Sequence, residues 1–395
     1  MRTALAAVAL VLLVIAVGAF AMLLAPPAAF PIPQANITVG PAAGPSYQQL
    51  TSGGWDDISP EWSPDGSRIA YLSDRGGLWS VWVMEANGSR QTKLTPAATY
   101  LAYPVWSPDS SRIAFWEETP PTSSLVVVNA TTGSVLAASP RSDDVASAAP
   151  VWSPDGSLLL YYRMTPSVEL ACLDPATGSV RPLTAVNGTD ATASWAGVDR
   201  VVFSSLDGGH YTIRWLNMTS GEEGVLTNAT YDSRGGVISP DGTKIAYYSD
   251  VFLVRSYYNL YDISGYNVWE SSLHITQYDI WANGLSSYNS SYLYGPGGEA
   301  NQYRPGSVMT AEALRWSSDG KYIACVLDNA VSGPRVYLWT VGTSSVLMAG
   351  PFTGVAYHPS WQPNSTIVAF DCNASGSFHI WTSSMAGSHA VVSGY

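Results

Sequence analysis

A five-residue motif, Trp-Ser-Pro-Asp-Gly, recurs along this chain at nearly constant intervals. It occurs unchanged twice and in altered form five times, at Trp62–Gly66, Trp106–Ser110, Trp152–Gly156, Trp195–Gly197, Ile238–Gly242, Trp316–Gly320 and Trp361–Ser365. The first residue of each copy, here called the anchor residue, follows the previous one by 44, 46, 43 and 43 residues as far as Ile238, and Trp361 follows Trp316 by 45. A period in the forties with strand-like segments inside each repeat is typical of a β-propeller built from four-stranded blades.

Each copy of the motif has the composition of a strand end followed by a tight turn. Proline removes a ladder donor and presets φ, aspartate can bond its own backbone, and glycine accepts the positive φ that closes a hairpin. Second strands are predicted at Arg68–Leu72, Arg112–Trp116 and Lys244–Tyr248, and third strands at Ser80–Met84, Leu125–Val128, Glu169–Leu173 and Val336–Thr340. A fourth strand ends in Leu-Thr, and its leucine stands 12 residues before the next anchor residue at Leu94, Leu183 and Leu226.

The combined pattern resembles the TolB-type propeller repeat, a relative of WD-repeat blades. It consists of Trp-Ser-Pro-Asp-Gly, Ile-Ala-Tyr, Ser-Asp-Arg-Gly-Gly and Leu-Thr, and it covers approximately residues 46–395. The resemblance implies an all-β propeller with seven clear blades and room for a degenerate eighth. The resemblance does not indicate one particular function, because such propellers serve as binding scaffolds, as lids of prolyl-peptidase-like enzymes and occasionally as lyases.

The repeat is irregular between Ile238 and Trp316, which are 78 residues apart. A degenerate anchor at Trp281 would begin an eighth blade, but its expected second strand, Ser286–Tyr292, is polar. The alternative is an inserted hairpin and loop.

Ring closure also has two candidates. Propellers often complete their last blade with a strand from the other end of the chain. Tyr47–Thr51 resembles a fourth strand, and Leu50 stands 12 residues before Trp62. His389–Ser393 aligns with the same position, and the pattern does not choose between them.

The chain begins with an apolar segment. Ala4–Ala25 has no charge and is long enough to span a bilayer. The sequence Ala19–Ala21 offers a signal cleavage site but lies inside the apolar run, so residues 1–25 are interpreted as a membrane-spanning segment in preference to a removed signal. Arg2 and the amino terminus then place the propeller outside the cytoplasm. The Pro/Ala-rich residues 26–45 are a linker.

The charge and composition of the chain limit the classes of partner that it can bind. The net charge is −12, and lysine occurs only at Lys93, Lys244 and Lys321. This argues against nucleic acid, whose phosphates need a basic footprint. No cofactor motif is present. Cys172, Cys325 and Cys372 have no metal-ligand spacing and are interpreted as small buried residues, with a bridge between Cys325 and Cys372 left open.

Nine of the fourteen asparagines stand in Asn-x-Ser/Thr sequences, the acceptor pattern for N-glycosylation. They are Asn36, Asn87, Asn129, Asn187, Asn217, Asn228, Asn289, Asn364 and Asn373. Asparagine also favours turns, but turn chemistry explains the location of these residues better than their number. A glycosylated surface protein is therefore predicted.

Two sets of titratable residues are candidates for cation binding or catalysis. Five repeats carry a carboxylate 12 residues after the anchor residue, at Asp74, Glu118, Asp207, Asp250 and Asp328, where turn formation is the favoured explanation over a cation-binding rim. Oligogalacturonate lyases, which the resemblance includes, gather histidines from several blades, and His210, His358 and His379 are the candidates here. No nucleophile elbow, zinc motif or phosphate loop is present. We expect neither a catalytic nor a metal site.

The region Asp250–Ala311 is the long departure from the repeat, and it is rich in tyrosine, serine, asparagine and glycine. Such a mixture resembles an adaptable binding surface, although packing within an atypical blade would also explain it. The candidate ligand-binding residues are Tyr257, Tyr258, Tyr261, Tyr266, Trp269, Tyr278, Trp281, Tyr288, Tyr292 and Tyr294.

The sequence therefore predicts an extracytoplasmic propeller, tethered or secreted, that binds an envelope protein or a polysaccharide. A metal-assisted propeller lyase and a structural subunit of a surface layer are the alternatives.

Overall fold

The chain divides into two compact units, Met1–Gln34 and Ala35–Tyr395, and every residue described belongs to the second. The computed structural model describes residues 36–39, 47–96, 100–119, 122–141, 148–163, 168–188, 192–227, 233–242, 244–251, 270–277, 291–293, 314–329, 333–341, 345–351, 353–385 and 390–393. The predicted membrane-spanning segment lies outside these residues. Within them, no helix is long and apolar enough to cross a membrane.

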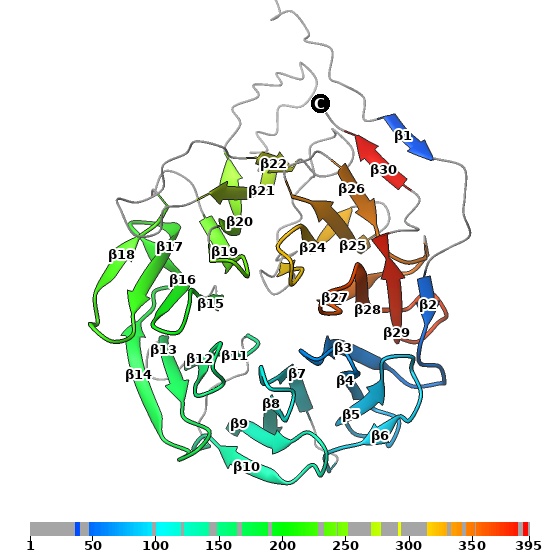
Figure 1. Ribbon diagram of the computed structural model, residues 1–395, viewed down its shortest axis with the longest axis horizontal. Helices are drawn as coiled ribbons and strands as arrows, with labels where there is room; N and C mark the ends of the chain where they lie inside the picture. Colours follow the sequence, from blue (N-terminus) through cyan, green and yellow to red (C-terminus); the bar gives the residue numbers. More distant parts are fainter. Residues whose placement is uncertain are drawn as a thin grey trace, which may run out of the picture. The chain divides into compact units, whose positions relative to one another are not determined.

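The described strands form seven antiparallel sheets around a common centre, with the first strand of each sheet innermost (Figure 1). Six sheets have four strands and one has six. We number the sheets as blades 1–7 in chain order of their anchor residues. The all-β propeller of four-stranded blades is therefore confirmed.

The first four blades consist entirely of consecutive strands. Blade 1 contains β3 (Asp57–Trp62), β4 (Arg68–Ser73), β5 (Ser80–Glu85) and β6 (Thr92–Lys93). Blade 2 contains β7 (Tyr100–Trp106), β8 (Arg112–Thr119), β9 (Thr122–Asn129) and β10 (Val135–Ala138). Blade 3 contains β11 (Val151–Trp152), β12 (Leu159–Arg163), β13 (Glu169–Leu173) and β14 (Val180–Ala185). Blade 4 contains β15 (Ala193–Trp195), β16 (Arg200–Asp207), β17 (His210–Asn217) and β18 (Glu223–Val225).

The remaining three blades include the irregular segment and both ends of the propeller. Blade 5 contains β19 (Ser233–Ile238), β20 (Lys244–Val251), β21 (Glu270–Gln277) and β22 (Ser291–Leu293). Blade 6 contains β23 (Arg315–Trp316), β24 (Tyr322–Asn329), β25 (Gly333–Thr340) and β26 (Ser345–Met348), extended by β30 (Ala390–Ser393) and β1 (Asn36–Val39). Blade 7 contains β27 (Ala356–Trp361), β28 (Ile367–Cys372), β29 (His379–Ser384) and β2 (Tyr47–Gln49).

The Ser-Pro-Asp-Gly part of the motif forms the turn between first and second strands, as predicted. In blade 3, Ser153 Oγ donates to Asp155 Oδ1 at 2.6 Å and accepts from the Leu158 backbone N–H at 2.9 Å, while Gly156 has φ +70°. The same serine–aspartate bond in blade 2, assisted by Ser111, lowers the pKa of Asp109 to about 2. These turns are therefore held by their own side chains.

The anchor tryptophans also join neighbouring blades. In five of the six, the indole Nε1 donates to the carbonyl of the residue that precedes the anchor residue of the previous blade, at Trp106–Glu61 (3.0 Å), Trp152–Val105 (3.3 Å), Trp195–Val151 (3.1 Å), Trp316–Val237 (2.9 Å) and Trp361–Arg315 (3.0 Å). The Trp62 Nε1 is buried and has no hydrogen-bond partner among the described residues. A buried indole needs such an acceptor. The recurrence of tryptophan is thereby explained by fold alone.

The ring closes through the N-terminal segment. β2 pairs with β29, and Thr51 Oγ1 accepts from the Ile380 backbone N–H at 3.0 Å. Thr95 and Thr227, which follow the fourth-strand leucines of blades 1 and 4, accept equivalent bonds at 3.0 and 2.9 Å. The alternative closure by His389–Ser393 is wrong, because β30 within that segment pairs with β26 and β1 in blade 6.

Part of the irregular region supplies the outer strands of blade 5. β21 pairs with β20, and β22 pairs with β21. Ser291–Leu293 is therefore the fourth strand of blade 5, whereas the eighth-blade hypothesis required Ser286–Tyr292 to be a second strand. Trp281, the expected eighth anchor residue, lies outside the described residues.

The core lies between adjacent blades. One cluster joins blades 1 and 2 through Leu72, Val81, Trp106 and Phe115. The three cysteines are buried and free, so Cys325 and Cys372 form no bridge. Burial raises the pKa of the Cys325 thiol to about 12, which keeps it protonated and unreactive.

Candidate functional site

The innermost strands of three blades contain a bulge with unusual backbone geometry. Ser59, Tyr103 and His358 have φ values of 54°, 55° and 49°, and each stands directly before a proline and three residues before its anchor tryptophan. The pairing register shifts at each of these places. A left-handed conformation is costly for residues other than glycine and tends to mark functional sites.

These bulges line a recess at the centre of the ring. Its walls come from blades 1, 2, 3, 6 and 7 and consist of Ser59, Pro60, Glu61, Tyr103, Pro104, Val105, Ala149, Arg315, His358 and Pro359. The concave space is about 370 Å³ and includes open solvent. Five of these residues are apolar and five carry polar or charged side chains, and a ligand site likewise combines apolar walls with placed polar groups.

Glu61 and Arg315 stand immediately before the anchor residues of blades 1 and 6. The corresponding residue is valine in blades 2, 3 and 5, at Val105, Val151 and Val237. Burial raises the pKa of the Glu61 carboxyl, and the positive charge of Arg315 and a hydrogen bond with Ser360 oppose that shift. The Arg315 guanidinium donates from one nitrogen to the Leu314 carbonyl at 3.2 Å. The corresponding residue is serine in blades 4 and 7, at Ser194 and Ser360, so the two charged residues occupy positions that the other blades fill with valine or serine.

His358 pairs with a buried carboxylate. Its Nδ1 lies 2.7 Å from Asp371 Oδ1, and the side chains are 37% and 1% exposed. The same carboxylate oxygen accepts from the Ser59 backbone N–H at 3.1 Å. Blades 1 and 6 have Leu72 and Val326 at the position of Asp371, so the blade does not need a carboxylate there.

Asp371 also has a structural counterpart in the other blades. Ser204, at the same position in blade 4, accepts from the Gly235 backbone N–H at 3.2 Å, and Tyr162 in blade 3 donates to the Thr192 carbonyl at 2.8 Å. A polar contact between neighbouring blades at this position is therefore part of the fold. The histidine is not explained in this way, because its imidazole lines the recess.

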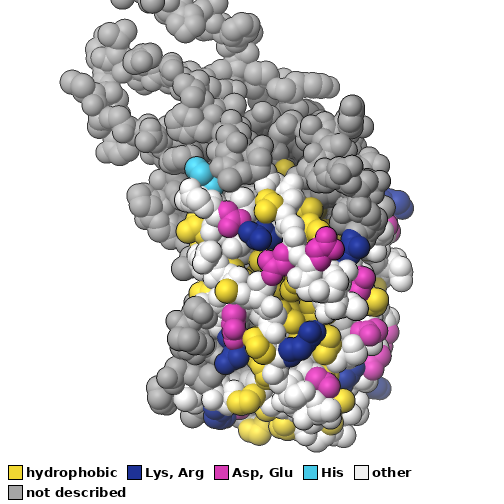
Figure 2. Space-filling view, turned by 90° about the vertical axis from the view of Figure 1, so that its left-hand side faces the viewer, with side chains coloured by type: hydrophobic (Ala, Val, Ile, Leu, Met, Phe, Trp, Pro, Cys, Tyr) yellow, Lys and Arg dark blue, Asp and Glu magenta, His cyan; other side chains and the backbone are white. Residues whose placement is uncertain are grey.

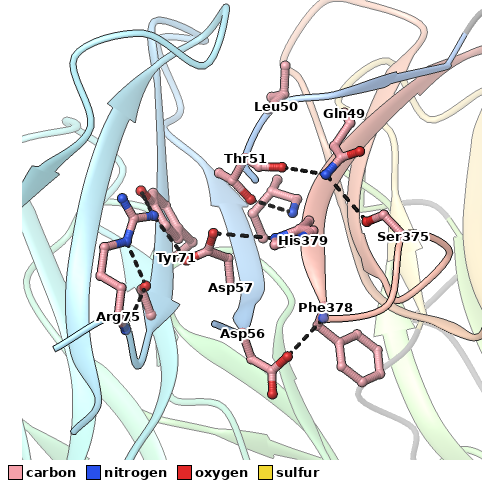
Figure 3. A network of polar contacts seen from close by, with 12 residues as sticks. Gln49, Leu50, Thr51, Asp56, Asp57, Tyr71, Arg75, Ser375, Phe378 and His379 are labelled. Atoms are coloured by element: carbon pink, nitrogen blue, oxygen red, sulfur yellow. Dashed lines mark hydrogen bonds and ion pairs between the residues drawn. The ribbon is translucent and has the colours of Figure 1, made fainter. Parts of the chain in front are cut away.

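A second polar cluster lies where blades 1 and 7 meet (Figure 3). Asp57 has a fully buried side chain, and its Oδ1 lies 3.0 Å from Arg75 while its Oδ2 lies 3.8 Å from His379 Nδ1. The Arg75 guanidinium also lies over the rings of Trp82 and Trp55, at 4.2 and 5.2 Å from their centroids. With Asp57 and His379 both closed to solvent, this cluster serves ring closure and not ligand binding.

In the predicted acidic rim, Asp74 lies in the turn after β4, whereas Asp207 is the last residue of strand β16. Asp74 Oδ1 accepts from the Asp56 backbone N–H at 2.9 Å. Asp207 Oδ2 accepts from Thr212 and Arg214, both at 2.9 Å. Glu118 lies at the end of β8, and for Asp250 and Asp328 only the backbone is described, in β20 and β24. Asp74 supports the turn interpretation, and Asp207 bonds residues of the adjacent strand β17.

The three candidate histidines occupy separate places. His210 begins the outer strand β17 and is exposed, His358 lines the recess, and His379 is buried at the seam. Among the described residues, no three histidine, cysteine or acidic side chains are grouped so that they could hold a metal ion. The convergence that the lyase hypothesis required is not found for these histidines.

The described sequon asparagines lie mostly in turns. Asn87, Asn129 and Asn217 lie between third and fourth strands, as predicted, and each side-chain oxygen accepts backbone N–H bonds from the same turn. Asn187 and Asn364 are exposed, whereas Asn373 accepts from the Val355 backbone N–H at 2.7 Å. Asn36 begins β1. Asn228 and Asn289 lie outside the described residues.

The tyrosine-rich candidates cannot be placed from the structure. Tyr292 lies in β22, where only the backbone is described. Tyr257, Tyr258, Tyr261, Tyr266, Trp269, Tyr278, Trp281, Tyr288 and Tyr294 lie outside the described residues. This surface stays a prediction.

Charges on the outer edge of the ring are interspersed and paired. Figure 2 shows acidic, basic and hydrophobic side chains mixed on the side that carries β14 and β18. Arg163 lies 2.8 Å from Glu169, and Arg214 lies 2.9 Å from Asp207. This described side offers no concentration of one charge.

Sequence reasoning missed Glu61, Tyr103 and Arg315, the site residues that come from inside regular repeats. The signal was available in the alignment of the repeats with one another. Positions one and three before the anchor residue change from apolar or small to charged or aromatic in particular blades. Comparison of these two positions among the seven repeats would have singled out Glu61, Tyr103 and Arg315.

Comparisons with known proteins agree with this architecture. A family model described as the TolB beta propeller domain matches residues 33–196. Among solved structures, the chain is similar to oligogalacturonate lyase from Vibrio parahaemolyticus (14% identity, TM-score 0.61, covering 89% of this chain and 97% of that one). It is also similar to TolB from Acinetobacter baumannii (17%, 0.52, 76% and 68%) and to hydrazine synthase from Kuenenia stuttgartiensis (14%, 0.59, 84% and 96%). No curated protein matches the sequence. At these identities the likenesses show the fold alone.

Proposed function

Since this chain is a β-propeller built from TolB-like repeats, we propose that it is an extracytoplasmic binding protein. It holds a surface polysaccharide or an envelope protein at the central recess. The similar structures include TolB and an oligogalacturonate lyase, so the fold does not decide among these roles. The proposal therefore rests on the site.

The main support is a contrast between two sets of polar residues: those that recur in the repeats bond within the fold, and those that do not recur line the recess. Most of the repeated tryptophan, serine, aspartate and threonine side chains that the structure describes have partners within the blades or between them, and the indole nitrogen of Trp62 is an exception. Glu61, Arg315 and His358 depart from the repeat, and all three line one concave space. Groups that no blade needs, gathered at one place, support a binding site.

The test uses the envelope of the host cell as the probe. The purified full-length chain in detergent is mixed with the host envelope fraction, and the retained protein is measured by sedimentation. We expect wild-type retention to be reduced at least tenfold in the double variant Glu61→Ala/Arg315→Ala, since charge-assisted hydrogen bonds contribute about 1.5–3 kcal/mol each. Arg214→Ala, on the outer edge of the ring, is the matched control and should be retained as well as wild type.

Three outcomes count against the proposal. Equal retention of wild type and the double variant would remove the recess as the site. Absence of wild-type retention would remove binding to the envelope altogether. Release of soluble fragments from the polysaccharide would favour the lyase alternative. Far-ultraviolet circular dichroism of each variant shows whether the fold is retained.

The tyrosine-rich segment is proposed as a second contact region. The support is its composition and its place between β20 and β23, where the repeat is interrupted. In the same sedimentation assay, Tyr288→Ala, Tyr292→Ala and Tyr294→Ala should each reduce affinity by about 1–2 kcal/mol if these rings are anchoring contacts. Unchanged affinity in all three variants would leave the recess as the proposed contact.

An exterior location is proposed from the uncharged segment Ala4–Ala25 and the sequons. Turn geometry at Asn129 and Asn217 does not demand asparagine, because Asp174 forms the same turn in blade 3 with bonds from the Ala176 and Thr177 backbone N–H groups. The choice of asparagine therefore supports a second use of these side chains.

We expect native protein to exceed its sequence mass by more than one glycan in intact-mass analysis. Protease added to intact cells should release a fragment that contains the propeller. An unmodified mass, or protection of the propeller until the cells are lysed, would contradict the exterior location.

A further inference from the structure

We propose that the central recess recognises a neutral saccharide unit, in preference to an acidic or a basic one. The inference rests on the proposed function and specifies its ligand. It follows from the hydrogen-bonding character of the groups that line the recess, from its walls and from its rigidity.

The two charged groups have opposite and complementary requirements. A guanidinium donates hydrogen bonds only, and an ionised carboxylate accepts them only. Arg315 and Glu61 line the same recess, and the charge of Arg315 acts on the Glu61 carboxyl. A uronate would be attracted by Arg315 but repelled by an ionised Glu61, and an amine would be attracted by Glu61 but repelled by Arg315, so either charge would leave one of the two residues opposed. A hydroxyl both donates and accepts, so a pair of sugar hydroxyls can satisfy both residues without net charge.

The His358–Asp371 pair keeps its carboxylate away from the recess, because Asp371 is 1% exposed and does not line it. The carboxylate of Asp371 is buried behind His358, bound to the imidazole at 2.7 Å and to the Ser59 backbone N–H at 3.1 Å. The imidazole is therefore the part of this pair that lines the recess.

The walls suit the C–H faces of a sugar ring. Tyr103 packs on the core cluster that contains Trp116 and Trp152, and it also lines the recess. Pro60, Pro104 and Pro359 are buried beside it and present rigid apolar surface. An aromatic ring with an apolar body and a polar tip is well suited to contact a ligand that has both kinds of surface.

The recess is also preorganised. Ser59, Tyr103 and His358 are held at positive φ by bulges, and each is followed by a proline that fixes the next φ. The Asp371 carboxylate binds both Ser59 and His358, which links blades 1 and 7 across the recess. Little conformational entropy is then lost when a ligand binds.

The test is isothermal titration of the full-length chain in detergent with a panel of defined oligosaccharides. Cellotetraose, maltotetraose and xylotetraose are the neutral probes, trigalacturonate is the acidic probe, and the glucosamine tetramer is the basic probe. We expect at least one neutral probe to bind at least tenfold more tightly than either charged probe. Arg214→Ala, on the outer edge of the ring, should bind like wild type.

The decisive variant is Glu61→Gln, which keeps the shape of the side chain and removes its charge. We expect affinity for the neutral probe to fall roughly tenfold, as for loss of a charge-assisted hydrogen bond. Affinity for trigalacturonate should rise in the same variant, because the repelling carboxylate is gone. If Glu61 had only a structural role, Glu61→Gln would weaken the binding of all probes alike. A higher affinity for trigalacturonate in this variant would exclude that explanation.

Several results would overturn the inference. Tighter binding of trigalacturonate or of the glucosamine tetramer to wild type would do so, and so would no binding of any neutral probe. If envelope retention still depends on Glu61 and Arg315 while no neutral probe binds, this inference fails and the proposed function stands. If neither assay shows binding, both fail.

Discussion

Replacement of Asp57 by alanine is expected to lower the free energy of unfolding by about 3–5 kcal/mol, the usual effect of removing one partner of a buried ion pair. Asp57 is fully buried, and Arg75, bonded to it at 3.0 Å, is only 15% exposed. Without the carboxylate, the guanidinium charge stays buried between the rings of Trp55 and Trp82. His379 also loses the negative group beside it.

The expected loss should appear in urea unfolding of the full-length chain. Asp207→Ala is the matched control, because it removes a carboxylate bound to Arg214 at a more exposed position, where such pairs contribute about 0–1 kcal/mol. The double variant Asp57→Ala/Arg75→Ala should be less destabilised than the sum of the single variants, because the uncompensated charge is gone. A loss below about 1 kcal/mol for Asp57→Ala would show that the buried Asp57–Arg75 pair contributes little to the stability of the fold.

Local chemistry made the blades predictable from sequence. The Ser-Pro-Asp-Gly turn is stabilised by residues within five positions of each other, so its outcome can be read from the motif. The pairing that closes the ring joins Tyr47 to Ser383, and both terminal segments have strand-like composition. The detail that separates them is Thr51, whose hydroxyl makes the fourth-strand bond. His389–Ser393 has no Leu-Thr pair.

The candidate site was harder to predict because it is assembled from different blades. Glu61 and Arg315 are 254 positions apart in the sequence and meet only when the ring is closed. Asp250–Ala311 stands out in the sequence because the spacing of the repeats is interrupted there. The recess is formed instead by unusual residue types at fixed positions of regularly spaced repeats. His358 was noticed, but its partner Asp371 was not, because a single aspartate in a strand has no local signature.

The packing between neighbouring blades gives the last prediction. Gly133 and Gly178 close the same turn in blades 2 and 3, with φ of 70° and 73°. Their N–H groups donate to Asn129 and Asp174 carbonyls at 2.9 and 2.8 Å. A Cβ at Gly133 would lie 1.9 Å from the Leu94 carbonyl oxygen of blade 1, whereas a Cβ at Gly178 would lie 3.9 Å from the Ala138 carbonyl oxygen of blade 2. The two sites share a conformation and differ in how closely the neighbouring blade approaches.

Gly178→Ala should therefore cost only the left-handed conformation of alanine, about 1–2 kcal/mol. Gly133→Ala should cost that amount plus about 1–3 kcal/mol, because backbone must move apart between two blades. Urea unfolding of both variants gives the difference directly, and the shared backbone term cancels. Equal losses would mean that blades 1 and 2 separate there at no cost, and the close approach of the turn to Leu94 would then contribute nothing to the stability of the ring.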